Sequence, residues 1–190
     1  YLDATIGVAV NRERLEAFVD EAPRMLRFLQ STGVQVAAAA WPDYFPDRGG
    51  ARADRSVIVP TFDGRRLGDG RYALMREQYN RFKLFGRYAM DLTETFTLMM
   101  QSKGWRMVAG RMIGRYWLDR PTRKVSHRDK RFTQGAALMG ATYEQVFARG
   151  VELRLETALE GLAVDEGGRV TGVEVSRFGR RYSVAARHGV

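Results

Sequence analysis

Apolar residues recur at helical spacing near the start of the chain. Asn11 has the side chain of a helix N-cap, and one apolar stripe follows it. The stripe consists of Leu15, Phe18, Val19, Ala22, Leu26 and Leu29. Pro23 is expected to break or kink this helix near Ala22, and Gly33 is expected to close it.

The pattern then changes to a short extended run and a loop. Residues 34–40 are mostly apolar, which predicts a short strand. The sequence Trp41-Pro42-Asp43-Tyr44-Phe45-Pro46 contains two prolines and an Asp, which is typical of a turn or loop. Arg48-Gly49-Gly50 prolongs it, so we expect an aromatic loop over residues 41–50.

Residues 64–131 predict several short helices. Aromatic residues and six of the eight Met alternate here with Arg or Lys; the methionines are Met75, Met90, Met99, Met100, Met107 and Met112. Gly104 and Gly114 are expected to mark bends or helix ends, and Pro121 to end the last helix.

The last stretch has the clearest pattern. Thr133 is predicted to cap a helix that stops at Gly150. Its apolar residues are Ala137, Leu138, Ala141, Val146 and Phe147. Residues 153–155 alternate like a short strand. Three further alternating runs, 159–164, 170–175 and 182–185, are separated by the turns 165–169 and 177–180 and predict a three-stranded antiparallel meander.

These patterns predict an α+β fold class with three parts. Residues 1–63 are expected to be helical with a loop at 41–50, and residues 64–131 to form a basic helical insertion. Residues 132–190 are expected to form a helix, a strand and an antiparallel β-meander. We detect no internal repeat.

Composition excludes several kinds of site. The chain has 190 residues and is 45% hydrophobic, which suffices to bury one ordinary core. It has no Cys, so disulfides and thiolate sites are excluded, and its two His are far apart, so no metal site is expected. We find no apolar run of membrane-spanning length and no signal-peptide pattern. The absence of Cys fits a reducing, cytoplasmic location.

The positive charge is concentrated in the middle stretch. Residues 64–131 contain 17 Lys and Arg against 6 Asp and Glu, a surplus of 11, whereas the whole chain carries +9. Three interpretations remain open. The stretch is a helical appendage with solvated Arg faces over a Met-rich core, an amphipathic surface for anionic lipid that makes the protein peripheral to the membrane, or a nucleic-acid-binding patch. The third is disfavoured because no nucleic-acid-binding motif accompanies the charge, and we expect no nucleic-acid partner.

Several short motifs resemble a known enzyme family. In the last stretch they are Gly135-Ala136-Ala137-Leu138, Arg149-Gly150-Val151-Glu152-Leu153, Thr157-Ala158-Leu159 and Gly168-Arg169-Val170-Thr171-Gly172-Val173. Their order and spacing resemble the FAD-dependent dehydrogenases of the fumarate reductase and 3-ketosteroid 1-dehydrogenase superfamily. Four motifs in the first stretch resemble the 3-ketosteroid 1-dehydrogenase branch. They are Tyr1-Leu2-Asp3-Ala4, Arg12-Glu13-Arg14-Leu15-Glu16-Ala17-Phe18, Pro42-Asp43-Tyr44-Phe45-Pro46 and Thr61-Phe62-Asp63-Gly64-Arg65-Arg66-Leu67-Gly68.

The resemblance implies FAD as cofactor, a steroid-like substrate and 1,2-desaturation of a 3-ketosteroid. Tyr44 matches a family tyrosine in the substrate cavity that assists a second, proton-abstracting tyrosine. Trp41 and Phe45 flank Tyr44, and one of the two is expected to form an apolar wall for a flat steroid. Ala158 matches a position whose backbone meets the adenine of FAD. From the residues alone, Tyr44 is better interpreted as a loop aromatic that packs on Trp41 or Phe45. Core packing is the alternative for Trp41 and Phe45, and an ordinary strand residue is the alternative for Ala158.

The resemblance covers only part of such an enzyme. No G-x-G-x-x-G sequence follows a strand, and the proton-abstracting tyrosine would lie beyond Val190. We therefore expect an internal fragment of a larger cytoplasmic enzyme, inactive in isolation and prone to self-association through exposed apolar surface. The alternatives are another FAD-dependent dehydrogenase of the superfamily and a non-catalytic, basic module that binds membrane surfaces or partners.

Overall fold

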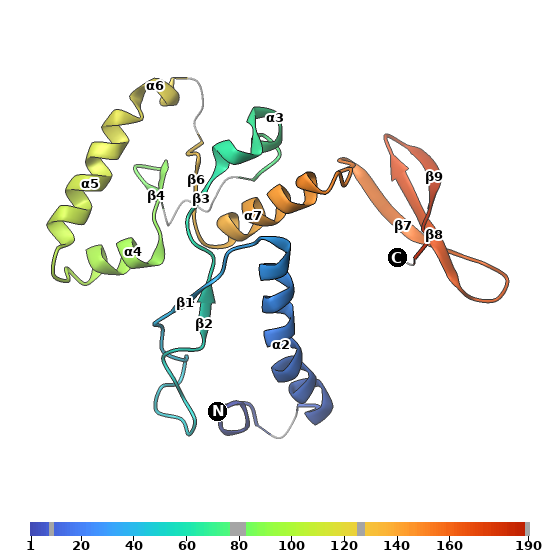
Figure 1. The fold of residues 1–190 in the computed structure, drawn as a ribbon, viewed down its shortest axis with the longest axis horizontal. Helices are drawn as coiled ribbons and strands as arrows, with labels where there is room; N and C mark the ends of the chain where they lie inside the picture. The colour runs from blue at the N-terminus through green and yellow to red at the C-terminus, as the bar shows by residue number, and fades with distance from the viewer. Residues whose placement is uncertain (8–9, 77–82, 125–127, 189–190) are drawn as a thin grey trace. The chain divides into compact units, whose positions relative to one another are not determined.

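The structure is a computed structural model that describes residues 1–7, 10–76, 83–124 and 128–188. The chain divides into two compact units, Tyr1–Arg149 and Gly150–Val190 (Figure 1). The second unit is small and contains the last strands, whereas the predicted helix after Thr133 belongs to the first unit. The predicted boundaries at 63 and 131 remain predictions.

The first unit contains helices and three small antiparallel strand pairs. Its helices are α1 (Leu2–Thr5), α2 (Arg12–Thr32), the 3-10 helix η1 (Gly64–Leu67), α3 (Asp69–Tyr72), α4 (Leu92–Met99), α5 (Trp105–Leu118), α6 (Arg120–Arg123) and α7 (Gln134–Ala148). Its strand pairs are β1 (Ala37–Ala39) with β2 (Ser56–Ile58), β3 (Phe62–Asp63) with β6 (Arg131–Phe132), and β4 (Lys83–Leu84) with β5 (Tyr88–Ala89).

Helix α2 begins and ends where the sequence predicts. The Asn11 side chain accepts a hydrogen bond from the Arg14 backbone N–H at 3.3 Å, and Gly33 closes the helix in the left-handed region at φ 102°. The expected break at Pro23 is wrong, because α2 continues through it, and a kink there stays a prediction. Pro23 has no N–H to donate to the Val19 carbonyl oxygen. Because Val19 is exposed, water can donate to this oxygen instead.

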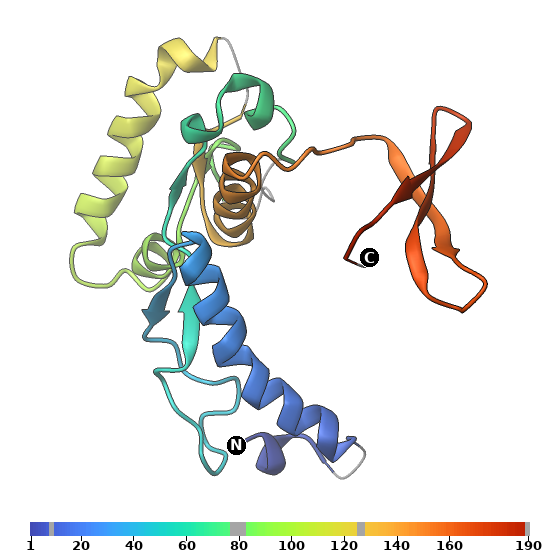
Figure 2. The same ribbon diagram turned by 45° about the vertical axis from the view of Figure 1, so that its right-hand side comes forward.

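The core of the first unit lies where α7 packs against the β3–β6 pair and η1 (Figures 1 and 2). Its buried residues are Val34, Phe62, Leu67, Tyr72, Met75, Phe132, Ala137 and Ala141. Gly140 on α7 allows this approach, since a β-carbon there would lie 2.8 Å from the Phe62 ring. Thr133 holds the N-cap position as predicted, but its hydroxyl donates to the Met90 carbonyl oxygen at 2.9 Å instead of capping.

The described part of residues 64–131 is largely helical. The helix end predicted at Pro121 is wrong, and Gly114 marks no helix end, while a bend at Gly114 stays a prediction. Gly104 does precede α5, with φ 90°. Gly114 lies inside α5, and Pro121 lies in the first turn of α6, where its missing N–H costs no helical hydrogen bond. Among the described residues, no helix is long and apolar enough to cross a membrane.

The second unit is a three-stranded antiparallel sheet, ordered β7 (Thr157–Val164), β8 (Val170–Arg177) and β9 (Arg180–Ala185). The β7–β8 turn is closed by the Asp165 side chain, which accepts the backbone N–H groups of Gly167 and Arg169 at 3.0 and 2.9 Å. The predicted strand at 153–155 is wrong, because those residues pair with no strand. Glu152 and Arg154 instead form an exposed ion pair at 3.1 Å.

Candidate functional site

The predicted aromatic loop is tied at its base by Asp43. The Asp43 backbone N–H donates to the Arg52 carbonyl oxygen at 2.9 Å, and the Asp43 carboxylate accepts the Arg52 N–H at 2.8 Å. The same carboxylate forms an ion pair with Arg55, which also donates to the Gly50 carbonyl oxygen at 2.9 Å. These bonds fix the segment between β1 and β2 into a defined loop.

The loop presents its three aromatic residues differently. Tyr44 is 94% exposed and packs on neither neighbour, which contradicts its interpretation as a packing residue. Trp41 packs against Phe96 of α4, with ring centroids 4.5 Å apart, and keeps one part of its surface exposed. Phe45 is also half exposed, and its N–H donates to the Tyr1 hydroxyl at 3.3 Å. The catalytic and substrate roles of these residues remain predictions.

Ala158 lies in the second unit, on β7. It pairs with Ser176 of β8 and is exposed. Because β7 is an edge strand of the sheet, its outer backbone groups are open to a ligand. A backbone contact with adenine is compatible with this position and stays a prediction.

An apolar cavity of about 430 Å³ lies beside β2 and the first turns of α4 and α7. Its apolar lining residues are Val57, Ile58, Val59, Pro60, Leu92 and Leu138. The aromatic loop enters β2, and Trp41 packs on α4, so the loop and the cavity share these two elements. Pattern analysis missed this cavity because its walls come from three distant segments.

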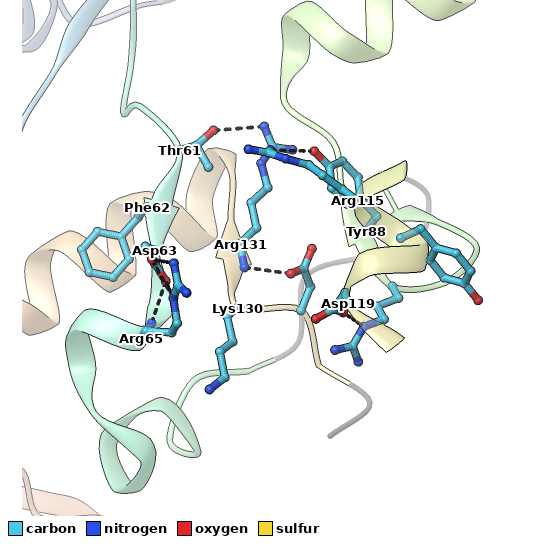
Figure 3. Close-up of a pocket in the computed structure, with 12 residues that line it drawn as sticks. Thr61, Phe62, Asp63, Arg65, Tyr88, Arg115, Asp119, Lys130 and Arg131 are labelled. Carbon is cyan, nitrogen blue, oxygen red and sulfur yellow. Dashed lines mark hydrogen bonds and ion pairs between the residues drawn. The ribbon is translucent and has the colours of Figure 1, made fainter. Parts of the chain in front are cut away.

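A charged cavity of about 410 Å³ lies between the β3–β6 pair and the end of α5 (Figure 3). Its cationic lining residues are Arg65, Arg87, Arg115, Lys130 and Arg131, and its acidic ones are Asp63, Asp119 and Asp129. Tyr88 and Tyr116 complete the walls. The sequence indicated that this stretch is basic, but it gave no sign that residues 61–65 and 87–131 enclose a common cavity.

Arg131 is the centre of the ion-pair network behind this cavity. Its guanidinium contacts Glu94 at 2.7 Å and Asp91 at 2.9 Å, and it lies over the Tyr88 ring. Glu94 is 3% exposed and also accepts from Arg111 at 3.1 Å. The expectation of solvated Arg faces is therefore wrong for Arg131, and likewise for the buried Arg87.

The expected Met-rich core of the middle stretch is also wrong. Met75 and Met112 are buried, but Met99, Met100 and Met107 are exposed at the corner between α4 and α5. Polar and ionic contacts stabilise the inner face of this stretch instead.

Comparison with known proteins identifies the family. The family profile described as the FAD binding domain matches residues 1–190. The chain belongs to this FAD binding domain family. It is 30% identical over its whole length to a 3-oxosteroid 1-dehydrogenase of Comamonas testosteroni and 26% identical to one of Mycolicibacterium smegmatis, covering 34% of each. The mixed helix and strand fold matches a crystal structure of 3-ketosteroid delta1-dehydrogenase from Sterolibacterium denitrificans in complex with 1,4-androstadiene-3,17-dione. That match has a TM-score of 0.85 and 32% identity and covers all of this chain and 34% of the other.

The chain thus spans about a third of the length of these relatives. Its residues fit part of a flavin site. The exposed edge of β7 offers backbone groups for an adenine, whereas a glycine-rich pyrophosphate turn is absent from the sequence. Among the described residues, no group of His, Asp or Glu is arranged to hold a metal ion.

Proposed function

We propose that the whole protein is an FAD-dependent 3-ketosteroid 1-dehydrogenase, to which this chain contributes part of a Rossmann-like FAD-binding domain. The observation that carries the proposal is the likeness of all 190 residues to the steroid dehydrogenase of Sterolibacterium denitrificans, at 32% identity and a TM-score of 0.85. Curated relatives that match the chain are 3-oxosteroid 1-dehydrogenases as well. In the isolated chain the flavin and catalytic sites are incomplete, so it is inactive.

The reaction removes a proton beside the ketone and a hydride from the neighbouring carbon. FAD, when bound, accepts the hydride. Tyr44 of this chain holds a hydroxyl at the substrate and assists the base that abstracts the proton. Its exposure supports this role, because the hydroxyl is open to meet a substrate and another part of the protein.

The apolar surface for the steroid comes from the same side of the first unit. The apolar cavity of about 430 Å³ falls within the size range of small-molecule sites and is lined mainly by aliphatic side chains. The exposed parts of Trp41 and Phe45 extend this apolar surface along the loop. Ala158 contributes a backbone contact to the adenine of FAD.

The experiment is dye-linked steroid dehydrogenation by the full-length protein and its Tyr44→Phe variant. General acid–base assistance contributes at least about 100-fold, so the variant should lose that much rate with its flavin spectrum intact. Tyr143→Phe, the same change on α7 away from the loop, is the matched control and should keep the rate.

Two results would redirect the proposal. A full-length protein that binds flavin but does not oxidise 3-ketosteroids acts on another activated carbonyl compound, as another member of the superfamily. An active protein whose rate is unaffected by Tyr44→Phe keeps the steroid assignment but removes Tyr44 from the catalytic group.

A second proposal is that the corner between α4 and α5 contacts a membrane surface. Met99, Met100 and Met107 are 74%, 71% and 76% exposed, and Lys103 and Arg106 lie on the same corner. Exposed apolar side chains flanked by cations suit anionic lipid. Binding to anionic vesicles should weaken as salt rises and with Met107→Ser, but not with Met139→Ser on α7. Equal binding by both variants would reject this surface.

We also propose that the isolated chain self-associates. Phe18, Met25 and Phe28 form an exposed apolar face on α2, which is unusual for a monomeric soluble protein. Sedimentation should show dimers or larger species, and Phe18→Ser with Phe28→Ser should shift them toward monomer. A wild-type chain that remains monomeric at high concentration would contradict the proposal.

A further inference from the structure

The charged cavity differs from the apolar cavity in what it can bind. Its lining holds five cationic and three acidic side chains, a formal surplus of two positive charges. A steroid ketone has no charge to match this surplus. The ligand chemistry of the cavity must therefore be considered separately from the steroid reaction.

The three carboxylates of the lining are already engaged by the protein. Asp63 bonds Arg65 at 2.8 Å, and Asp119 bonds Arg87 at 2.6 Å (Figure 3). Both oxygens of Asp129 accept backbone N–H groups, from Ala89 at 3.1 Å and from Arg131 at 3.0 Å. These contacts fix the carboxylates and hold the paired guanidinium groups in place.

Two features leave positive charge facing the cavity. Arg131 lines the cavity, but the two carboxylates that pair with it, those of Asp91 and Glu94, do not. The Arg131 guanidinium therefore borders the cavity while its counter-charges lie behind it. Among the described residues, Arg115 forms a hydrogen bond to the Tyr88 hydroxyl at 3.1 Å and no ion pair. Its exposed guanidinium therefore retains most of its donors for a ligand.

From this arrangement we propose that the charged cavity binds a phosphate group, with Arg115 as its principal ligand. A guanidinium group can donate two parallel hydrogen bonds to two oxygens of a phosphate. Arg115, which forms no ion pair among the described residues, supplies the positive charge for it. Tyr88 and Tyr116 border the group to which the phosphate is attached. The phosphate belongs either to a small soluble molecule or to a lipid headgroup, and both offer the same oxygens. The proposal for this cavity does not rest on the proposed steroid activity.

The test uses the full-length protein, inorganic phosphate as the probe, and isothermal titration calorimetry at low ionic strength. We expect one phosphate per chain. Arg115→Gln should weaken phosphate binding about tenfold or more, because charged hydrogen bonds are lost. The phosphate affinity of Arg115→Lys should lie between that of Arg115→Gln and that of the wild type. Arg14→Gln is the matched control: Arg14 is an exposed arginine on α2 and is not in the lining.

A second arm distinguishes the two sources of phosphate. Binding of each variant is measured to phosphatidylcholine vesicles that contain phosphatidic acid and to vesicles that lack it. Binding to phosphatidic acid that is lost with Arg115→Gln identifies a lipid headgroup, and phosphate binding without it identifies a soluble ligand. The proposal is overturned if neither probe binds, or if Arg115→Gln and Arg14→Gln weaken binding equally. Circular dichroism checks folding, and Arg65→Gln on the opposite wall replaces Arg115→Gln if that variant misfolds.

Steroid-dependent dye reduction is measured on the same preparation without phosphate. Failure of the steroid assay leaves the phosphate measurement intact, and failure of the phosphate measurement leaves the steroid assay intact.

Discussion

Glu94 offers a direct test of whether the ion-pair network holds the first unit together. Glu94→Gln removes the charge but preserves the shape and an amide oxygen. That oxygen can still accept the Asp91 N–H, which Glu94 accepts at 3.2 Å in the capping box of α4. The substitution therefore isolates the ion pairs from helix capping.

The expected loss follows from burial. Glu94 is 3% exposed and meets the Arg131 side chain, itself 14% exposed, at 2.7 Å. Breaking a buried pair costs about 3–5 kcal/mol, but Arg131 keeps Asp91 at 2.9 Å, so the lower end applies. The second partner, Arg111, is 59% exposed, and its pair contributes less than about 1 kcal/mol. We expect the free energy of unfolding to fall by about 3 kcal/mol.

Urea denaturation followed by Trp fluorescence measures this loss, because all three Trp lie in the first unit. Glu144→Gln is the matched control. Glu144 binds Arg66 through two contacts, at 2.8 and 2.6 Å, but the Arg66 side chain is exposed, so a loss of at most about 1 kcal/mol is expected. Equal losses for the two variants would refute the conclusion that burial makes the Glu94 network dominant.

Three further changes test other parts of the structure. Gly140→Ala brings a methyl group against the Phe62 ring, and this overpacking should lower the free energy of unfolding by about 1–3 kcal/mol. The better helix propensity of Ala returns about 1 kcal/mol of that loss. The same urea assay measures the net change, and a stabilised variant would contradict the prediction. Gly172→Ala drives a methyl group against the backbone at Val184, so strand signals in circular dichroism should fall while Trp fluorescence stays unchanged. Burial raises the pKa of Asp129, so the stability it contributes is present at low pH and is lost as pH rises through that pKa. An Asp129 pKa below the ordinary Asp range, measured by NMR titration of the carboxyl group, would refute this.

Local signals predicted the parts of the fold that depend on neighbouring residues. The ends of α2 were predictable because Asn11 and Gly33 act within one turn of the helix. The strands around the Asp165 turn were predictable for the same reason, since the side chain bonds residues two and four positions further on. Gly114 misled because a glycine in a 14-residue helix costs only about 1 kcal/mol, which the packing of α5 against α4 offsets.

The cavities were not predictable, because they depend on contacts between distant residues. Arg131 bonds Thr61, 70 positions away, and Glu94, 37 positions away. Nothing in the local pattern distinguishes these Arg and Glu residues from solvated ones. Of the candidate site, the sequence placed three aromatic residues in one loop, but it could not show that Tyr44 projects outward while Trp41 packs on α4.

The middle stretch forms walls of both cavities, which argues against its being a dispensable appendage. Arg131 faces the charged cavity and bonds Asp91, and Asp91 lines the apolar cavity. A ligand that draws the Arg131 side chain toward the charged cavity would weaken the ion pair between Arg131 and Asp91, which lies beside the apolar cavity. The Arg131 side chain is 14% and the Asp91 side chain 36% exposed, so solvent screens such a shift only in part, and the polarity of the apolar cavity would change with it. The two cavities therefore meet at the Arg131–Asp91 ion pair and also share Thr61, so a change at one cavity can reach the other.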